Sequence, residues 1–144
     1  MRVPVCEATT RAQPEPMKIL VIDDDHLVLY TLTRILERNG YEVVTATDGR
    51  RAMAIFRDER PDVVITDLIM PEQEGIETIM MIRHERPEVG VIAISGGARS
   101  RNFDYLRMAG SLGAAEVIRK PFEAEELLSR LDRLRTASPT GTTG

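Results

Sequence analysis

Acidic side chains occupy the positions of this 144-residue sequence that are best suited to chemistry. Three consecutive aspartates, Asp23, Asp24 and Asp25, follow the apolar run KILVI, and Asp67 follows the apolar run VVIT. Carboxylates that lie close together repel one another, so such a group is costly unless a cation lies among them. Magnesium suits the group, because it takes one or two carboxylates, a carbonyl and several waters and often completes its shell with a phosphoryl oxygen. The acidic residues therefore predict phosphoryl chemistry that depends on Mg²⁺.

A hydroxyl and an ammonium group follow two further apolar runs. Ser95 comes after VIAI and precedes two glycines, and Lys120 comes after EVIR and precedes Pro121. With the exposed amides of the glycine loop, these groups are the donors that hold the equatorial oxygens of a transferred phosphoryl group. Each signal is weak when taken alone: Asp25 is equally well explained as a helix N-cap, and a glycine pair is usually an ordinary loop. Their conjunction indicates a site.

Five short runs rich in Val and Ile predict the β-strands that position these groups. The runs are Lys18 to Ile22, Glu42 to Ala46, Val63 to Thr66, Val91 to Ile94 and Glu116 to Arg119. Three of them are apolar continuously rather than alternately, as a parallel strand covered on both faces requires. Amphipathic segments separate the runs, so the sequence predicts an α/β domain with a doubly wound parallel sheet of five strands. Ligands bind such sheets beyond the carboxyl ends of the strands, where all of the chemical groups lie.

The amphipathic segments predict five helices. The second spans Gly49 to Arg57 and the fourth roughly Asn102 to Leu112. The first, which Asp25 would precede as N-cap, is marked by Leu29, Leu32, Ile35 and Leu36, and the fifth by Leu127, Leu128, Leu131 and Leu134. In the first segment the pair Asn39-Gly40 supplies the left-handed stop. In the third segment Ile76, Ile79, Met80 and Arg83 recur at helical spacing, and the helix ends before Pro87.

The composition is that of one soluble globular domain: 42% of the residues are hydrophobic and 29% are charged. Nineteen basic and 23 acidic residues give a formal charge of −4. A nucleic-acid binder would need a positive electrostatic field, which this balance does not provide. The single cysteine, Cys6, excludes an intrachain disulfide and a cysteine-based metal cluster, which favours a cytoplasmic protein. No run approaches the ~18 apolar residues of a membrane span, so neither nucleic acid nor a membrane is expected as a partner.

Both ends of the sequence lack apolar periodicity. Residues 1–16 contain three prolines, and residues 136–144 form a polar tail of low complexity, so we expect disordered extensions around one domain over 17–135. Met17, directly before the first strand, is an alternative start. We expect the domain to act alone, because the residues after Arg135 are too few for a second module.

The segments KILVIDDD, DVVITDLIMPEQEG, VIAISGG and VIRKPF together resemble the receiver domain of two-component response regulators, from Lys18 to about Leu134. The resemblance implies a flavodoxin-like strand order 2-1-3-4-5. It also implies that Asp67 accepts a phosphoryl group from a histidine kinase or a histidine phosphotransfer protein. Mg²⁺ would be bound directly by Asp24, through water by Asp23, and by Asp67 and the backbone carbonyl of Ile69.

The resemblance assigns roles to the remaining groups as well. Ser95 and Lys120 would bind phosphoryl oxygens, and the Lys120-Pro121 peptide would be cis. Such a protein catalyses only its own phosphorylation and dephosphorylation, lies in the cytoplasm, and signals to a downstream protein target that the sequence does not identify or by onward phosphotransfer. Val117 stands where the family often has an aromatic switch residue. The resemblance also implies that Ile69 and Gly97 flank the path of attacking water. Neither side chain can orient water, so we expect slow hydrolysis of the phosphoryl group.

Two other functions fit parts of the sequence. A haloacid-dehalogenase-like phosphatase would use Asp23 as nucleophile, Asp25 as acid, and Ser95 and Lys120 as its second and third motifs, again with Mg²⁺. That alternative leaves the segment DLIMPEQEG unexplained and provides no space for a cap domain. A pseudo-receiver that only binds partners would not need the acceptor chemistry that the sequence contains.

Overall fold

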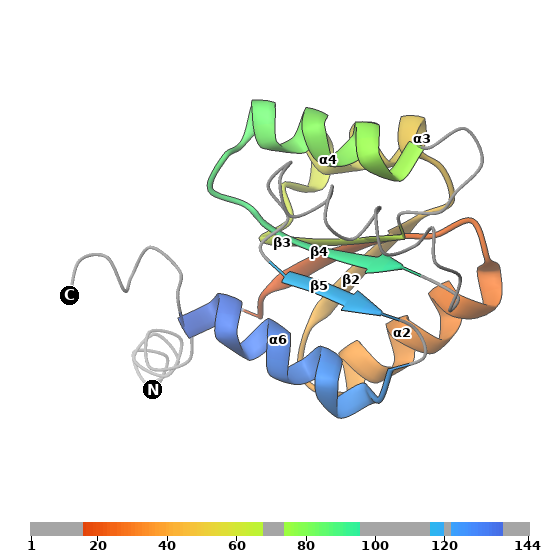
Figure 1. Cartoon of the computed structure of the whole chain (residues 1–144), viewed down its shortest axis with the longest axis vertical. Coiled ribbons are helices and arrows are strands. Elements are labelled where there is room, and N and C mark those ends of the chain that lie inside the picture. The colour runs from red at the N-terminus through yellow and green to blue at the C-terminus, as the bar shows by residue number, and fades with distance from the viewer. Residues whose placement is uncertain (1–15, 68–73, 96–115, 120–121, 137–144) are drawn as a thin grey trace, which may run out of the picture.

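Five parallel strands form one sheet in the order β2-β1-β3-β4-β5 (Figure 1). The computed structural model describes residues 16–67, 74–95, 116–119 and 122–136. The strands are β1 (Lys18–Ile22), β2 (Glu42–Ala46), β3 (Val63–Asp67), β4 (Gly90–Ser95) and β5 (Glu116–Arg119). The predicted doubly wound sheet and its flavodoxin-like order are confirmed. The predicted helix over 102–112, residues 1–15 and residues 137–144 lie outside the described residues.

Two strands are longer than the sequence indicates, and the extra residues matter for the site. β3 continues to Asp67, whose Cα pairs with that of Ile94, and β4 continues to Ser95, whose Cα pairs with that of Arg119. Asp67 and Ser95 are therefore the last residues of paired strands. Their backbone positions are fixed by the sheet rather than by a loop.

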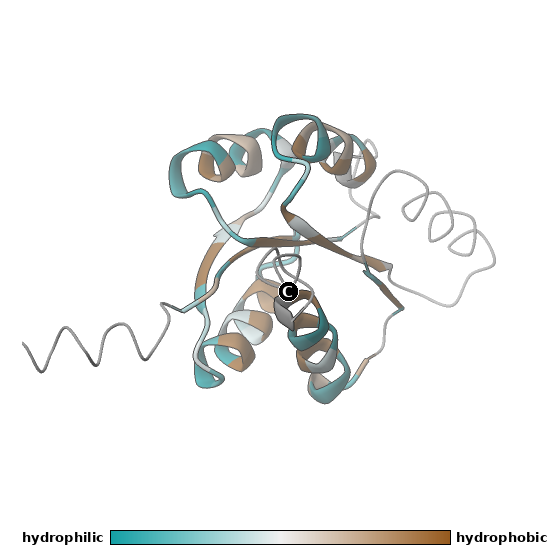
Figure 2. Ribbon diagram, turned by 90° about the vertical axis from the view of Figure 1, so that its left-hand side faces the viewer, coloured by the Kyte–Doolittle hydropathy of each residue, from teal (hydrophilic) through white to brown (hydrophobic). Residues whose placement is uncertain are grey.

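Helices cover both faces of the sheet (Figure 1, Figure 2). α2 (His26–Arg38) and α6 (Ala124–Thr136) lie on one face, and α3 (Gly49–Glu59) and α4 (Glu74–Glu85) lie on the other. In β1, Ile19 and Val21 pack beneath α2 and α6, whereas Leu20 and Ile22 pack beneath α3 and α4. This double cover is the reason that the strand is apolar without alternation.

The first helix begins and ends where the sequence predicts. The Asp25 side chain accepts a hydrogen bond of 2.9 Å from the backbone N–H of Leu27, as an N-cap does. After Asn39 the chain turns at Gly40, whose φ of 90° is in the region that favours glycine. The helix buries Leu29, Leu32 and Leu36 against the sheet.

The third predicted helix is present as α4, and not all of the residues that mark it face the core. In α4, Ile76, Ile79 and Ile82 are buried, whereas Met80 is 51% exposed. Met80 is spaced i, i+4 from Ile76 and Ile82 is spaced i, i+3 from Ile79, so both fit a helical repeat. The structure buries the β-branched Ile82 against the sheet and leaves the flexible Met80 in solvent.

The remaining described helices follow the predicted spacing. α6 buries Leu127 and Leu131 completely and packs Leu128 and Leu134 partly against the same cluster. α3 buries Met53 in addition to the predicted Ala52 and Phe56, and the predicted Ile55 is only partly buried against the same cluster. Within the described ranges, no helix has the length and apolarity that crossing a membrane requires.

Candidate functional site

The two acidic segments of the sequence meet at the carboxyl edge of the sheet because β1 and β3 are neighbours. Asp23 follows β1 directly, and its backbone N–H donates a hydrogen bond of 3.2 Å to the carbonyl of Ala46 at the end of β2. Asp67 is the last residue of β3. Two adjacent strand ends therefore hold the backbones of these aspartates side by side.

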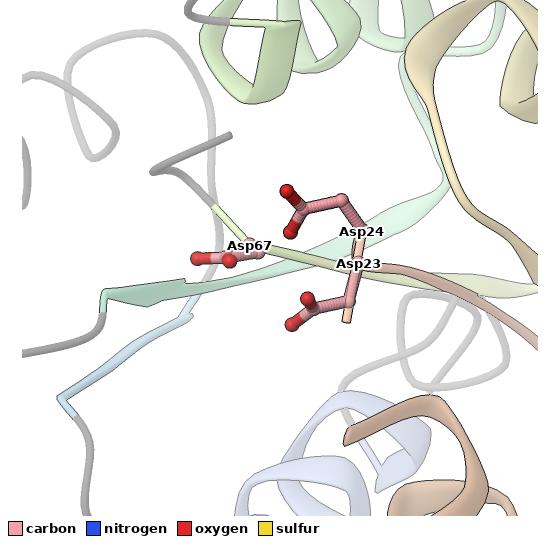
Figure 3. A group of neighbouring side chains, drawn as sticks. All are labelled: Asp23, Asp24 and Asp67. Carbon is pink, nitrogen blue, oxygen red and sulfur yellow. The ribbon is translucent and has the colours of Figure 1, made fainter. Parts of the chain in front are cut away.

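Three carboxylates form one group at this edge. One oxygen from each of Asp23, Asp24 and Asp67 lies within 4.8 Å of the others. Figure 3 shows Asp23 and Asp24 directed to opposite sides of the end of β1, with Asp67 beside them. Asp23 and Asp67 are buried, at 3% and 7% exposed, and Asp24 is exposed. The group is thus anchored in the protein and open to solvent through Asp24.

The electrostatics of this group favour a divalent cation. Two carboxylates within 4.8 Å of each other repel by about 3 kcal/mol or more at the effective dielectric constant of a protein surface. One oxygen of Asp23 accepts a hydrogen bond of 2.9 Å from the backbone N–H of Asp25, which offsets part of the repulsion. Hard carboxylate oxygens, at most three from the protein, leave room for the waters and phosphoryl oxygen that Mg²⁺ retains. The donor set fits Mg²⁺.

Asp25 does not belong to this group. Its side chain caps α2, and its carbonyl accepts the hydrogen bond of 3.1 Å from Leu29 that closes the first helical turn. The N-cap interpretation of Asp25 is therefore confirmed. The phosphatase alternative needs Asp25 as a general acid, but its side chain is hydrogen-bonded as a helix cap.

The other predicted site residues are only partly described. The backbone of Ser95 ends β4, next to β3, and Arg119 ends β5, so the segment that follows it starts at the same edge. Ile69, Gly97, Lys120 and the Lys120-Pro121 peptide lie outside the described residues. Their predicted roles, and the role of the Ser95 hydroxyl, stay predictions.

Two observations at the site add to the sequence analysis. Thr66 is fully buried, and its hydroxyl donates a hydrogen bond of 3.2 Å to the carbonyl of Asp67. A threonine within an apolar strand is common, so no sequence signal distinguishes this one. Val117, in the position of the family's frequent aromatic residue, is half-buried and packs against the core beneath α3 and α4.

Comparison with known proteins agrees with this geometry. The sequence profile of the response regulator receiver domain matches residues 19–132. The response regulator MprA of Mycolicibacterium vanbaalenii is 38% identical over 120 residues, which are 83% of this chain and 50% of MprA. The alkaline phosphatase synthesis transcriptional regulatory protein PhoP of Bacillus subtilis is 33% identical, over 85% of this chain and 52% of PhoP. The chain thus spans about half the length of these relatives.

Solved structures give the same result. A response regulator receiver domain protein from Clostridium thermocellum superimposes with a TM-score of 0.76 at 34% identity, covering 82% of this chain and 93% of that one. The chemotaxis protein CheY4 of Vibrio cholerae superimposes with a TM-score of 0.74 at 30% identity, covering 83% and 98%. With the sheet order, the acidic group at its carboxyl edge and the profile match in agreement, this chain belongs to the response regulator receiver domain family.

Proposed function

We propose that this chain is a single-domain response regulator that is phosphorylated on Asp67. The group formed by Asp23, Asp24 and Asp67 is the observation that carries the proposal. Of the three, only Asp67 is itself a strand residue, the last of the central strand β3, so the sheet holds its backbone in place. Asp24, which is exposed, leaves the group open to a phosphodonor.

The donor is the phosphohistidine of a histidine kinase or of a histidine phosphotransfer protein. An oxygen of the Asp67 carboxylate attacks phosphorus, a P–O bond forms, and the P–N bond to the donor imidazole breaks. Buried Asp23 and exposed Asp24 hold negative charge beside this reaction, with the Ile69 carbonyl as a further ligand from the sequence analysis. Bound Mg²⁺ supplies the positive charge that lets the anionic phosphoryl group approach three carboxylates.

Ser95 and Lys120 complete the proposed reaction by holding phosphoryl oxygens. The backbone position of Ser95, at the end of the strand next to β3, supports its part in this role. A hydroxyl and an ammonium group at this edge would stabilise charge that develops on the equatorial oxygens.

The proposed output is contact with a downstream protein or onward phosphotransfer, within the cytoplasm. MprA and PhoP, of which this chain matches about half, are named as a response regulator and as a transcriptional regulatory protein. The chemotaxis protein CheY4 is matched over nearly its whole chain and supports a receiver that acts without an attached module. We propose no enzymatic activity beyond the protein's own phosphorylation and dephosphorylation.

Phosphorylation by a small phosphodonor tests the acceptor. The full chain is incubated with acetyl phosphate and Mg²⁺, and intact-mass and peptide mapping locate the added group. We expect one phosphoryl group on Asp67 in the wild type and in Asp25→Asn, which keeps the helix cap, and none in Asp67→Asn. Wild-type phosphorylation of Asp67→Asn, or a phosphoaspartate at Asp23, would overturn the proposal and favour the phosphatase.

A further inference from the structure

A groove of about 350 Å³ lies between α3 and α4, on the face of the sheet opposite α2 and α6. The α3 wall contains Arg50, Met53 and Arg57, and the α4 wall includes Glu77 and Met81. We propose that this groove binds a helix of a partner protein. That helix presents an apolar stripe with an acidic side chain on the flank toward α3 and a basic side chain on the flank toward α4.

The two walls carry opposite charges at matching heights. Arg50, Met53 and Arg57 recur with the spacing i, i+3, i+7, so they lie on one face of α3. Glu77 and Met81, with Glu85 one turn further, recur with the spacing i, i+4, i+8 on one face of α4. Each wall therefore has a methionine between two charged residues, basic on α3 and acidic on α4.

The groove is closed at the end far from the acidic group. The Arg57 guanidinium bonds both carboxylate oxygens of Glu85, from Nε at 3.1 Å to each and from Nη2 at 2.5 Å. The Arg86 guanidinium lies 5.3 Å from the centroid of the buried Phe56 ring, which ties the end of α4 to α3 a second time. The opposite charges at this end, Arg57 and Glu85, thus already pair with each other within the chain.

At the other end, where both helices begin, the charged side chains lack partners within the described residues. Arg50 and Glu77 are exposed, and neither forms an ion pair or side-chain hydrogen bond within the described part of the chain. An incoming carboxylate toward Arg50 and an incoming cation toward Glu77 would complete the unsatisfied pair. A uniformly acidic or uniformly basic partner would meet one repulsive wall.

The floor of the groove suits apolar side chains. Met53, at 4% exposed, closes the bottom of the groove as part of the core, and Met81, at 43% exposed, provides a flexible apolar surface that a partner can reach. The helix rises about 10 Å from Arg50 to Arg57, which is about two turns of a helix laid along the groove. Parallel walls with this repeat favour a helical segment over a compact ligand.

Two synthetic peptides of identical composition test the proposal on the full chain. Each is a fluorescent helix of about five turns with a leucine stripe. Its first turn carries one Glu and one Lys on opposite flanks, exchanged between the two peptides. We expect the wild type to prefer one peptide by about fivefold in anisotropy titrations, and the double variant Arg50→Glu, Glu77→Arg to prefer the other by a similar factor.

Paired methionine variants locate the binding. Met81→Lys should abolish binding of both peptides, whereas Met80→Lys, on an equally exposed neighbour outside the groove, should leave it unchanged. Absence of binding, equal binding of both peptides, or a preference that the double variant leaves unchanged would overturn the proposal. Self-association of the wild type that the double variant abolishes would also overturn it and assign the groove to a second copy of this chain.

Discussion

Neutralising Asp24 should make the metal-free protein more stable. Asp24 has two carboxylate neighbours, Asp23 and Asp67, with oxygens within 4.8 Å. At that distance each pair repels by about 1 kcal/mol in bulk water and by about 3 kcal/mol at the dielectric constant of a protein surface. Because Asp24 is exposed, the lower figure applies, and Asp24→Asn should raise the free energy of unfolding by about 1 to 2 kcal/mol.

Urea unfolding with and without Mg²⁺ measures this effect. A gain of that size moves the urea midpoint upward by roughly 0.5 to 1 M for a domain of this size. Saturating Mg²⁺ should reverse the order, because the wild type binds the ion and is stabilised by about 3 kcal/mol at a hundredfold excess over its Kd. The variant should gain much less.

Asp25→Asn is the matched control, since Asn also caps helices and Asp25 lies outside the group of three carboxylates. It should shift the midpoint little and keep the response to Mg²⁺. A metal-free Asp24→Asn protein that is no more stable than the wild type would refute the electrostatic account of the site. A response to Mg²⁺ equal to that of the wild type would remove Asp24 from the metal ligands.

Two further outcomes follow from the structure, and a third follows from the family resemblance of the sequence. Ile79→Ala should destabilise the domain by about 2 to 5 kcal/mol and Met80→Ala by less than about 0.5 kcal/mol, which thermal unfolding would show, because only Ile79 is buried. The bidentate contact from Arg57 lowers the pKa of Glu85, so its stabilising effect is present at neutral pH and is lost as the pH falls below about 4. Unfolding of Glu85→Gln beside the wild type across this range should therefore show a deficit at neutral pH that vanishes in acid. Finally, Ile69→Asn should shorten the lifetime of the phosphorylated protein by about tenfold, because Asn can orient the attacking water. Unchanged decay of labelled phosphate would show that water positioning does not limit hydrolysis.

The strands and their order could be predicted because burial on both faces leaves a strong local signal. β1 is apolar at every position after Lys18, and the side chains that alternate between the two faces of the sheet all meet a helix layer. The ends of the strands then place Asp23 and Asp67 together without further information, since adjacent parallel strands end at one edge. A candidate site built from strand ends is therefore accessible from sequence.

The local sequence determines which face of a helix is buried less strongly than it determines the strands. Met80 and Ile82 both continue the repeat begun by Ile76 and Ile79, and the rotation of α4 about its axis decides between them. That rotation depends on how α4 packs on β3 and on α3, which involves residues far away in the sequence. The same holds for the pair Arg57 and Glu85, 28 positions apart, whose contact fixes α4 against α3.

The groove between α3 and α4 belongs to this second class of features. Its charge pattern is present in the sequence as Arg50, Met53 and Arg57 on one helix and Glu77 and Met81 on another, but only the packing of the two helices aligns the patterns. The closed pair at one end shows that the spacing of the helices permits an Arg to Glu contact. Arg50 and Glu77, at the other end, are the same residue types but form no ion pair within the described residues. The proposed partner helix would supply the opposite charges that these two side chains lack.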